Sequence, residues 1–234
     1  MASDANRDLK AALAQAYGIL FREGMAEDTT RGHITAKAAD GTIYIKPWGM
    51  GFEEVKAGDL LGVDGDGKLR DGTGRLHSEL ILHLEIYRRR ADVFSIAHVH
   101  PFHAVLLSAQ FSGELHIVSQ QGFHFGGGVP VYASPDMIRT REQATELAAL
   151  LADGPVVLMR NHGFVTAGRT VAEAAILAID FEKAAKEHLM VSLYEKTLVM
   201  DREQVREMNR KIYSAEQYGM LWDYYCRKLG RTGK

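Results

Sequence analysis

Residues 93–101 read VFSIAHVHP, an apolar and partly β-branched run that ends in His98, His100 and Pro101. Such a run, closed by a proline, predicts a buried β-strand. Alternate side chains of a strand share one face, so the two histidines should project from the same side, separated by about 6.5–7 Å of backbone rise. Two imidazoles so placed can bind one metal ion. Two half-buried strand histidines with local hydrogen bonds are an equally good interpretation of an isolated His-x-His pair.

The segments on either side of this strand alternate between strand and helix patterns. Short strands are predicted at 34–35, 41–45, 60–63, 129–132, 156–159 and 164–166. Apolar residues at three- and four-residue steps predict helices at 4–24, 78–90, 103–110, 140–152 and 170–196. A polar and aromatic tail with a weak helical pattern follows from about 201, and it contains Tyr213, Tyr218, Trp222, Tyr224 and Tyr225. We therefore expect one α/β domain over residues 1–234, ending in this tail.

Composition excludes several classes of protein. The 234 residues carry 28 Lys and Arg against 30 Asp and Glu, a net charge of −2, which makes nucleic acid an unlikely partner. No window approaches the roughly 18 consecutive apolar residues that span a bilayer, and the start is too polar for a signal peptide. We therefore expect a cytoplasmic protein that does not bind membranes. Cys226 is the single cysteine, so any metal must be held by histidines and carboxylates.

A third candidate metal ligand lies far along the chain. His162 stands in the sequence Met159-Arg-Asn-His-Gly163, which predicts a sharp turn between two apolar strands. Gly163 suits such a turn because glycine adopts backbone conformations that other residues resist. A histidine at a strand-ending turn can reach a site that neighbouring strands share, although alone it is more often an ordinary turn residue. Three neutral imidazoles with an open coordination position are typical of a catalytic metal site.

Glu79 would complete this set. Ser78 is a plausible N-cap of the 78–90 helix, which places Glu79 in the first turn. A carboxylate near the metal can ligate the ion or carry a proton. By itself, Glu79 is better explained as a solvated acid that the helix dipole favours. His77, which lies two residues before Glu79, is a second candidate for the proton transfer.

The order of five short motifs resembles the class II aldolase and adducin family. They are Gly32-His-Ile-Thr35, Ile45-Lys-Pro-Trp-Gly49, His77-Ser-Glu79, His98-Val-His-Pro101 and Asn161-His-Gly163. The likeness runs from about residue 10 to 200. It implies a three-layer α/β/α fold with a mainly antiparallel central sheet, and a homotetramer with sites at subunit interfaces. By position, the family's metal triad falls on His98, His100 and His162, and its catalytic acid/base on Glu79.

Departures from the family's sugar-phosphate aldolases bear on the substrate. An asparagine of the phosphate site is replaced by His33, a small hydroxyl residue by Trp48 or Pro47, and a serine by His77, while Ser78 is kept. A bulky indole removes room from a phosphate pocket and supplies a flat apolar wall, which suits a planar ring. His33 and His77 could pair with substrate carboxylates, through charge-assisted hydrogen bonds if they are protonated.

This pattern resembles the decarboxylase branch of the family, whose members act on hydroxylated aromatic or pyridine dicarboxylic acids. The resemblance implies a metal-dependent carbon–carbon lyase with a metal-stabilised enolate-type intermediate, for which Glu79 or His77 supplies the proton. It implies one divalent ion per subunit, manganese or zinc first among the candidates, and a small carboxylate as substrate. His33, Trp48 and Ser78 would bind that substrate. An aldolase for an unphosphorylated or unusual aldol, and a non-catalytic adducin-like scaffold, are the alternatives.

Overall fold

The computed structural model describes residues 4–26 and 28–230, so residues 1–3, 27 and 231–234 of the expected domain lie outside the described residues. Its centre is an eight-stranded sheet with the order β4-β3-β2-β1-β5-β8-β7-β6. Every neighbouring pair is antiparallel except β6 and β7, which are parallel. The expectation of a mainly antiparallel sheet is confirmed.

The bounds of the elements follow the sequence patterns closely. The strands are β1 (His33–Lys37), β2 (Ile43–Ile45), β3 (Leu61–Val63), β4 (Leu69–Asp71), β5 (Ser95–Val99), β6 (Val131–Tyr132), β7 (Val156–Met159) and β8 (Gly163–Gly168). The α-helices are α1 (Asp4–Arg22), α2 (Leu80–Arg89), α3 (Phe102–Gln110), α4 (Arg141–Leu151), α5 (Val171–Val191), α6 (Arg202–Ile212) and α7 (Ala215–Leu229). Short 3-10 helices are η1 (Phe52–Glu54), η2 (Ala57–Asp59) and η3 (Gln120–Phe125).

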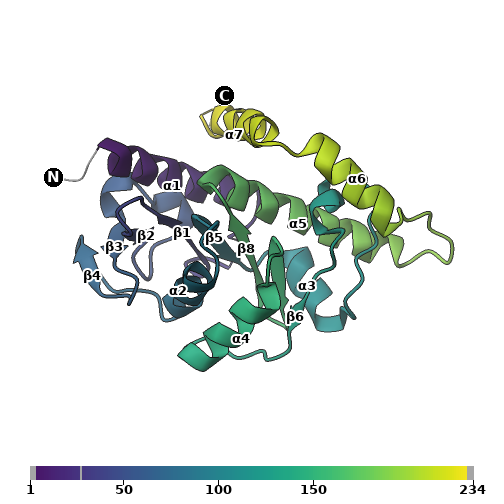
Figure 1. Ribbon diagram of the computed structural model, residues 1–234, viewed down its shortest axis with the longest axis horizontal. Coiled ribbons are helices and arrows are strands. Elements are labelled where there is room, and N and C mark those ends of the chain that lie inside the picture. Colours follow the sequence, from purple (N-terminus) through teal and green to yellow (C-terminus); the bar gives the residue numbers. More distant parts are fainter. Residues whose placement is uncertain (1–3, 27, 231–234) are drawn as a thin grey trace.

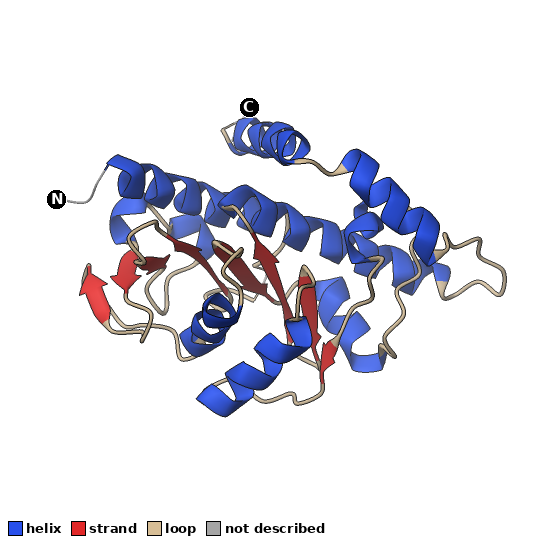
Figure 2. Ribbon diagram, in the orientation of Figure 1, coloured by secondary structure: helices blue, strands red, loops and turns tan. Residues whose placement is uncertain are grey.

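Helices cover both faces of the sheet, which makes three layers (Figures 1 and 2). Helices α1 and α5 lie on one face, and α2 and α4 on the other. Helix α3 packs against α5, while α6 and α7 lie outside the α1–α5 layer near the C-terminus. The sheet is thus buried on both sides, so its central strands are apolar almost throughout rather than alternating.

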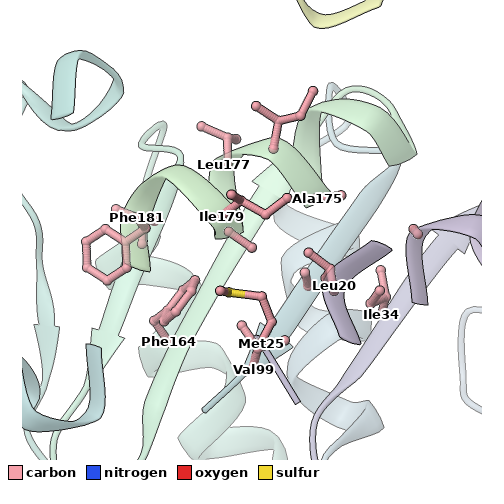
Figure 3. Packing of buried hydrophobic residues seen from close by; sticks show 14 of the residues in the cluster. Leu20, Met25, Ile34, Val99, Phe164, Ala175, Leu177, Ile179 and Phe181 are labelled. Carbon is pink, nitrogen blue, oxygen red and sulfur yellow. The ribbon is translucent and has the colours of Figure 1, made fainter. Parts of the chain in front are cut away.

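The larger core lies between the sheet and the α1–α5 layer. Figure 3 shows Leu20 of α1, Ile34 of β1, Phe164 of β8 and Phe181 of α5 meeting there, and all four are at most 2% exposed. Full burial of such a side chain contributes about 1.5–3 kcal/mol to stability. This packing makes the sheet a rigid support for side chains that project from its edge.

Three details differ from the sequence expectations. The 170–196 helix ends at Val191, and β4 was not predicted, because its exposed residues lack an apolar pattern. Helix α2 begins at Leu80, so Glu79 rather than Ser78 occupies the N-cap position, and no side chain caps the helix. The Ser78 cap was therefore wrong: residues 78 and 79 form a turn that leaves the Glu79 carboxylate free for another role.

No helix within residues 4–26 and 28–230 combines the length and the apolar character needed to cross a membrane.

Candidate metal centre

The antiparallel sheet brings distant histidines to one edge. Strand β1 starts where β5 ends, because His33 pairs with His98 in the β1–β5 register. Strand β8 also starts at this end of β5, since Val99 pairs with Phe164. The turn that carries His162 lies between β7 and β8, and it therefore stands beside His100, which follows β5 directly. Strand direction alone thus gathers four histidines at one place.

We call His98, His100 and His162 the histidine triad. One ring nitrogen from each lies within 4.8 Å of the others. The Nε2 atoms of His98 and His100 are 2.9 Å apart, and the ring centroids of His98 and His162 are separated by 5.1 Å. His98 is fully buried, whereas His100 and His162 are partly exposed. The predicted convergence of these three side chains is therefore observed.

The opposite ring nitrogens explain why Nε2 points inward. His98 Nδ1 lies 3.0 Å from the carbonyl oxygen of Phe164, and His100 Nδ1 lies 2.5 Å from Oδ2 of Asp28. Both partners accept, so each Nδ1 carries the proton and each Nε2 presents a lone pair. Two lone pairs at 2.9 Å repel unless a proton or a cation lies between them. The donor set therefore fits a divalent ion, and the outer hydrogen bonds are those that orient metal-binding imidazoles.

Glu79 lies beside the triad. Its Oε2 is 3.8 Å from Nε2 of both His98 and His162, and its Oε1 accepts a 2.9 Å hydrogen bond from the amide of Ile138. Burial would raise the pKa of this carboxyl, but its interactions with His98 and His162 and the hydrogen bond from the Ile138 amide lower the pKa to about 2. Glu79 is therefore an anion at neutral pH, placed either to ligate the ion or to accept a proton.

A cavity of about 650 Å³ opens onto this group. Its walls come from six segments that are distant in sequence. They contain Asp28, Thr30, Arg31, Gly32, His33, Trp48, His77, Ser78, Glu79, His100, Val105, Pro135, Met137, Asn161 and His162. A cavity of this size accommodates a small organic molecule. All predicted substrate-binding residues line it, whereas His98 lies behind the wall.

Trp48 forms an exposed part of this wall. Its side chain is 53% exposed, and the guanidinium carbon of Arg75 lies 4.3 Å from the ring centroid, a cation–π contact that supports one face of the indole. The half-exposed indole also lines the cavity. Ser78, also exposed, contributes a hydroxyl group to the same cavity.

His77 is held from behind by a buried lysine. Lys46 is 0% exposed, and its Nζ donates to the carbonyl oxygens of Thr30 and Met50 and lies 3.2 Å from Nε2 of His77. Burial lowers the pKa of Lys46 to about 8, partly offset by the charge of Asp28. Burial and the Lys46 charge lower the pKa of His77 to about 3. His77 is therefore neutral, and its Nε2 is occupied by the ammonium group.

His33 is neutral as well. Burial, then the neighbouring His83 and His77, lower its pKa well below the usual range. Neither the His33 nor the His77 imidazole carries a positive charge at neutral pH, so the condition for charge-assisted hydrogen bonds to a carboxylate is not met. As neutral imidazoles, each can still donate one hydrogen bond.

Gly163 is needed for a reason that differs from the one expected. The left-handed backbone of this turn is at Asn161, whose φ is 53°. A Cβ atom at Gly163 would instead clash with the carbonyl oxygen of Val99 and the ring of His100. Glycine thus lets the β8 start approach β5 closely enough for His162 to meet His100.

Sequence reasoning missed three residues that support the site. Asp28 orients His100, Lys46 joins three wall segments, and His83 is hydrogen-bonded to His33 at 2.8 Å. No helix or strand pattern in the sequence indicated the roles of Asp28 and Lys46, since the residues that they contact at the site lie elsewhere in the sequence. His83 lies within the predicted 78–90 helix, and its four-residue spacing from Tyr87 was the one local signal of a shared polar face.

Comparisons with known proteins identify the family of this chain. Residues 11–189 match the family model described as the class II aldolase and adducin N-terminal domain. The chain is 32% identical over 193 residues to the 3,4-dihydroxyphthalate decarboxylase of Arthrobacter keyseri, which covers 77% of each chain. It is 30% identical over 168 residues to the L-fuculose phosphate aldolase of Methanocaldococcus jannaschii, covering 70% of this chain and 87% of that protein.

A solved structure supports the fold. The aldolase II superfamily protein from Pseudomonas syringae superposes with a TM-score of 0.89 at 25% identity, over 99% of this chain and 96% of that one. The helices and strands described above therefore belong to a known arrangement of the backbone.

Proposed function

We propose, because the chain belongs to the class II aldolase and adducin family, that it is a metal-dependent lyase that decarboxylates a hydroxylated aromatic or pyridine dicarboxylate. Relatives in this family include decarboxylases and aldolases, which are lyases. The observation that carries the proposal is the histidine triad beside Glu79 at the base of a cavity with an indole wall. A divalent ion held by the triad, manganese or zinc by preference, would act as a Lewis acid on substrate oxygens.

Glu79 is the residue that we assign to proton transfer. As an anion it can take the proton of the phenolic hydroxyl and return it to the ring carbon that bears the carboxylate. The resulting dienone is a β-keto acid, whose carbon–carbon bond breaks as its electron pair flows into the ring and restores aromaticity. Carbon dioxide leaves, and the phenolate oxygen takes a proton from water. His77 is less suited, because its Nε2 is occupied by Lys46.

The cavity walls support a planar substrate. Trp48 offers an exposed ring face, and Arg31 contributes a guanidinium group to the lining. A flat aromatic acid can stack on the indole while its second carboxylate lies near the cation. An aldolase for an unphosphorylated aldol is the second candidate, favoured by similarity to the L-fuculose phosphate aldolase. The two reactions differ in their product, carbon dioxide or an aldehyde.

The experiment is a product screen. Purified protein is loaded in turn with manganese, zinc, cobalt or iron and incubated with hydroxylated benzene and pyridine dicarboxylates. Release of carbon dioxide that is lost in Glu79→Gln supports the decarboxylase. Release of an aldehyde from unphosphorylated aldols, with no carbon dioxide from any dicarboxylate, would favour the aldolase. Absence of both activities together with absence of bound metal would favour an adducin-like scaffold.

We also propose that the protein forms a homotetramer with sites at subunit contacts. Apolar side chains are exposed on α3, which also contributes Val105 to the cavity, and in the cavity wall: Phe102 and Leu106 on α3 and Met137 in the wall are 59%, 46% and 43% exposed. Exposed apolar groups gathered beside a site are typical of an interface. Light scattering on the purified protein should give four chains per particle, and a monomer would contradict this.

A further inference from the structure

A buried hydrogen-bonded chain of side chains leads away from the cavity. His33 and Thr35 alternate on β1, and His83 and Tyr87 are four residues apart on α2, so each pair faces the other. The distances are 2.8 Å from His33 Nδ1 to His83 Nε2, from His83 Nδ1 to Thr35 Oγ1, and from Thr35 Oγ1 to Tyr87 Oη. All four residues are buried, with 0–5% of each exposed.

The directions of these three hydrogen bonds depend on one another. A neutral imidazole has one donor and one acceptor nitrogen, and the Thr35 hydroxyl satisfies its own proton by donating to one of its two partners here, His83 or Tyr87, so two arrangements are possible. In one arrangement Tyr87 donates to Thr35, Thr35 donates to His83, and His83 donates to Nδ1 of His33. The proton of His33 is then on Nε2. In the reverse arrangement His33 carries its proton on Nδ1, and Nε2 is an acceptor.

The hydrogen bonds of Tyr87, at the far end of this series of side chains, distinguish the two arrangements. The reverse one requires Tyr87 to donate outward, and its acceptor there is the carbonyl oxygen of Phe94 at 3.4 Å. That distance is long for an O–H donor, and this carbonyl already accepts the Lys37 amide at 2.8 Å. The first arrangement gives the Tyr87 hydroxyl an acceptor at 2.8 Å and satisfies every donor between Tyr87 and His83.

The groups that surround His33 near the cavity favour the arrangement in which Tyr87 donates to Thr35. One ring nitrogen of His33 lies within 4.8 Å of an oxygen of Glu79 and a nitrogen of His98. An N–H group is attracted to a carboxylate, whereas a lone pair is repelled. With Nδ1 of His33 bonded to His83, Nε2 is the nitrogen that remains for a ligand in the cavity.

We propose that Tyr87, Thr35 and His83 hold His33 as a fixed Nε2–H donor toward an oxygen anion of the substrate. These three are positioning residues, because they act through His33 and do not line the cavity. The identity of the anion, a carboxylate of the dicarboxylate, rests on the proposed function. The tautomer of His33 does not, and it can be measured without any substrate.

The test is long-range proton–nitrogen correlation NMR on protein with isotope-labelled histidine, loaded with diamagnetic zinc. The His33 signals are identified by their loss in His33→Gln. We expect the Nε2–H tautomer of His33 and of His83 in the unsubstituted protein. An Nδ1–H tautomer of His33 would overturn the proposal, whatever reaction the protein catalyses.

Thr35→Val and Thr35→Ser are the matched variants. Valine has the shape of threonine but cannot donate to His83, whereas serine can, so only Thr35→Val should show mixed tautomers at His33 and His83. Loss of one oriented donor should raise KM for the dicarboxylate about tenfold in Thr35→Val, with kcat largely unchanged. If His33 and His83 have the same tautomers in Thr35→Val as in Thr35→Ser, the proposal is contradicted. The hydrogen-bonded side chains would then have only a structural role.

Discussion

Two buried polar clusters, the histidine triad and a group around His124, differ in their hydrogen bonds. In the histidine triad, His98 and His100 each use Nδ1 on an outer acceptor and turn Nε2 toward a shared point. The second cluster lies under the C-terminal helices. There His124 Nε2 is 3.2 Å from Asp180, and its Nδ1 is 3.1 Å from the hydroxyl of Tyr218.

The second cluster leaves no ring nitrogen of His124 for a ligand. Tyr213 completes it, with a ring centroid 3.6 Å from that of His124 and a hydroxyl 3.4 Å from Asp180. The cluster therefore joins η3, α5, α7 and the turn that follows α6. Buried imidazoles in the two clusters thus differ in what they can bind, because the triad has converging unused lone pairs and His124 has none. Among the described residues, no aromatic of the C-terminal tail lines the cavity of its own chain.

The largest expected effect comes from removing a triad member. His100→Ala should reduce turnover to background while the far-ultraviolet circular dichroism stays unchanged, because this side chain lies at a strand end and supports coordination more than the core. His124→Ala is the matched control from the other cluster, and it should keep most of its turnover and lose thermal stability. Full activity of His100→Ala would be incompatible with the assigned roles.

Asp28→Asn tests the outer shell of the triad. The amide keeps the shape of the side chain but removes the charge that faces Nδ1 of His100. We expect metal affinity to fall about 10–100-fold, as for other outer partners of metal-binding histidines. Competition with a chromogenic chelator measures this change. An unchanged affinity would mean that Asp28 does not orient His100.

Acid should destabilise the metal-free protein. Burial, then neighbouring charges, lower the pKa of both His77 and His162 to about 3, from 6.5 for an ordinary histidine. Between these values the unfolded chain binds more protons than the folded protein, so the free energy of unfolding falls as the pH is lowered through this window.

Calorimetry in the presence of a chelator tests this expectation. The midpoint of thermal unfolding should fall from pH 7 to pH 4, and His162→Gln should reduce the slope. A midpoint that stays level or rises on acidification would contradict the buried, neutral state of these rings.

The smallest expected effect is in the second cluster. Tyr218→Phe removes one hydrogen bond to His124 and should lower the free energy of unfolding by about 1 kcal/mol. Metal content should not change. Chemical denaturation and elemental analysis of the same preparation measure both quantities, and a loss of bound metal would show that the two clusters are coupled.

Local patterns in the sequence predicted the elements that carry the triad. The two-residue period of a strand placed His98 and His100 on one face, and the turn signal around Gly163 placed His162 at a strand end. No local pattern placed β1, β5 and β8 side by side, because strand order depends on packing between distant segments; only the family resemblance implied that the three histidines meet. The same limit applies to Ser78, whose capping pattern was locally plausible while tertiary contacts started the helix later.

The supporting residues were beyond local patterns. Asp28 meets His100 across 72 residues, and Lys46 meets His77 across 31. Neither sequence separation matches the period of a strand or a helix. The roles of Asp28 and Lys46 can therefore be recognised only when the folded sheet is known. The sequence left the charge states of His33 and His77 open, since they depend on burial.

The central claim is that His98, His100 and His162 bind one divalent ion. Elemental analysis of the protein and of single alanine variants at these three positions, with His124→Ala alongside, tests it most directly. We predict close to one ion per chain in the unsubstituted protein and in His124→Ala, and strong loss in each triad variant. An unsubstituted protein with well under half an ion per chain, even after incubation with manganese or zinc, would contradict the account.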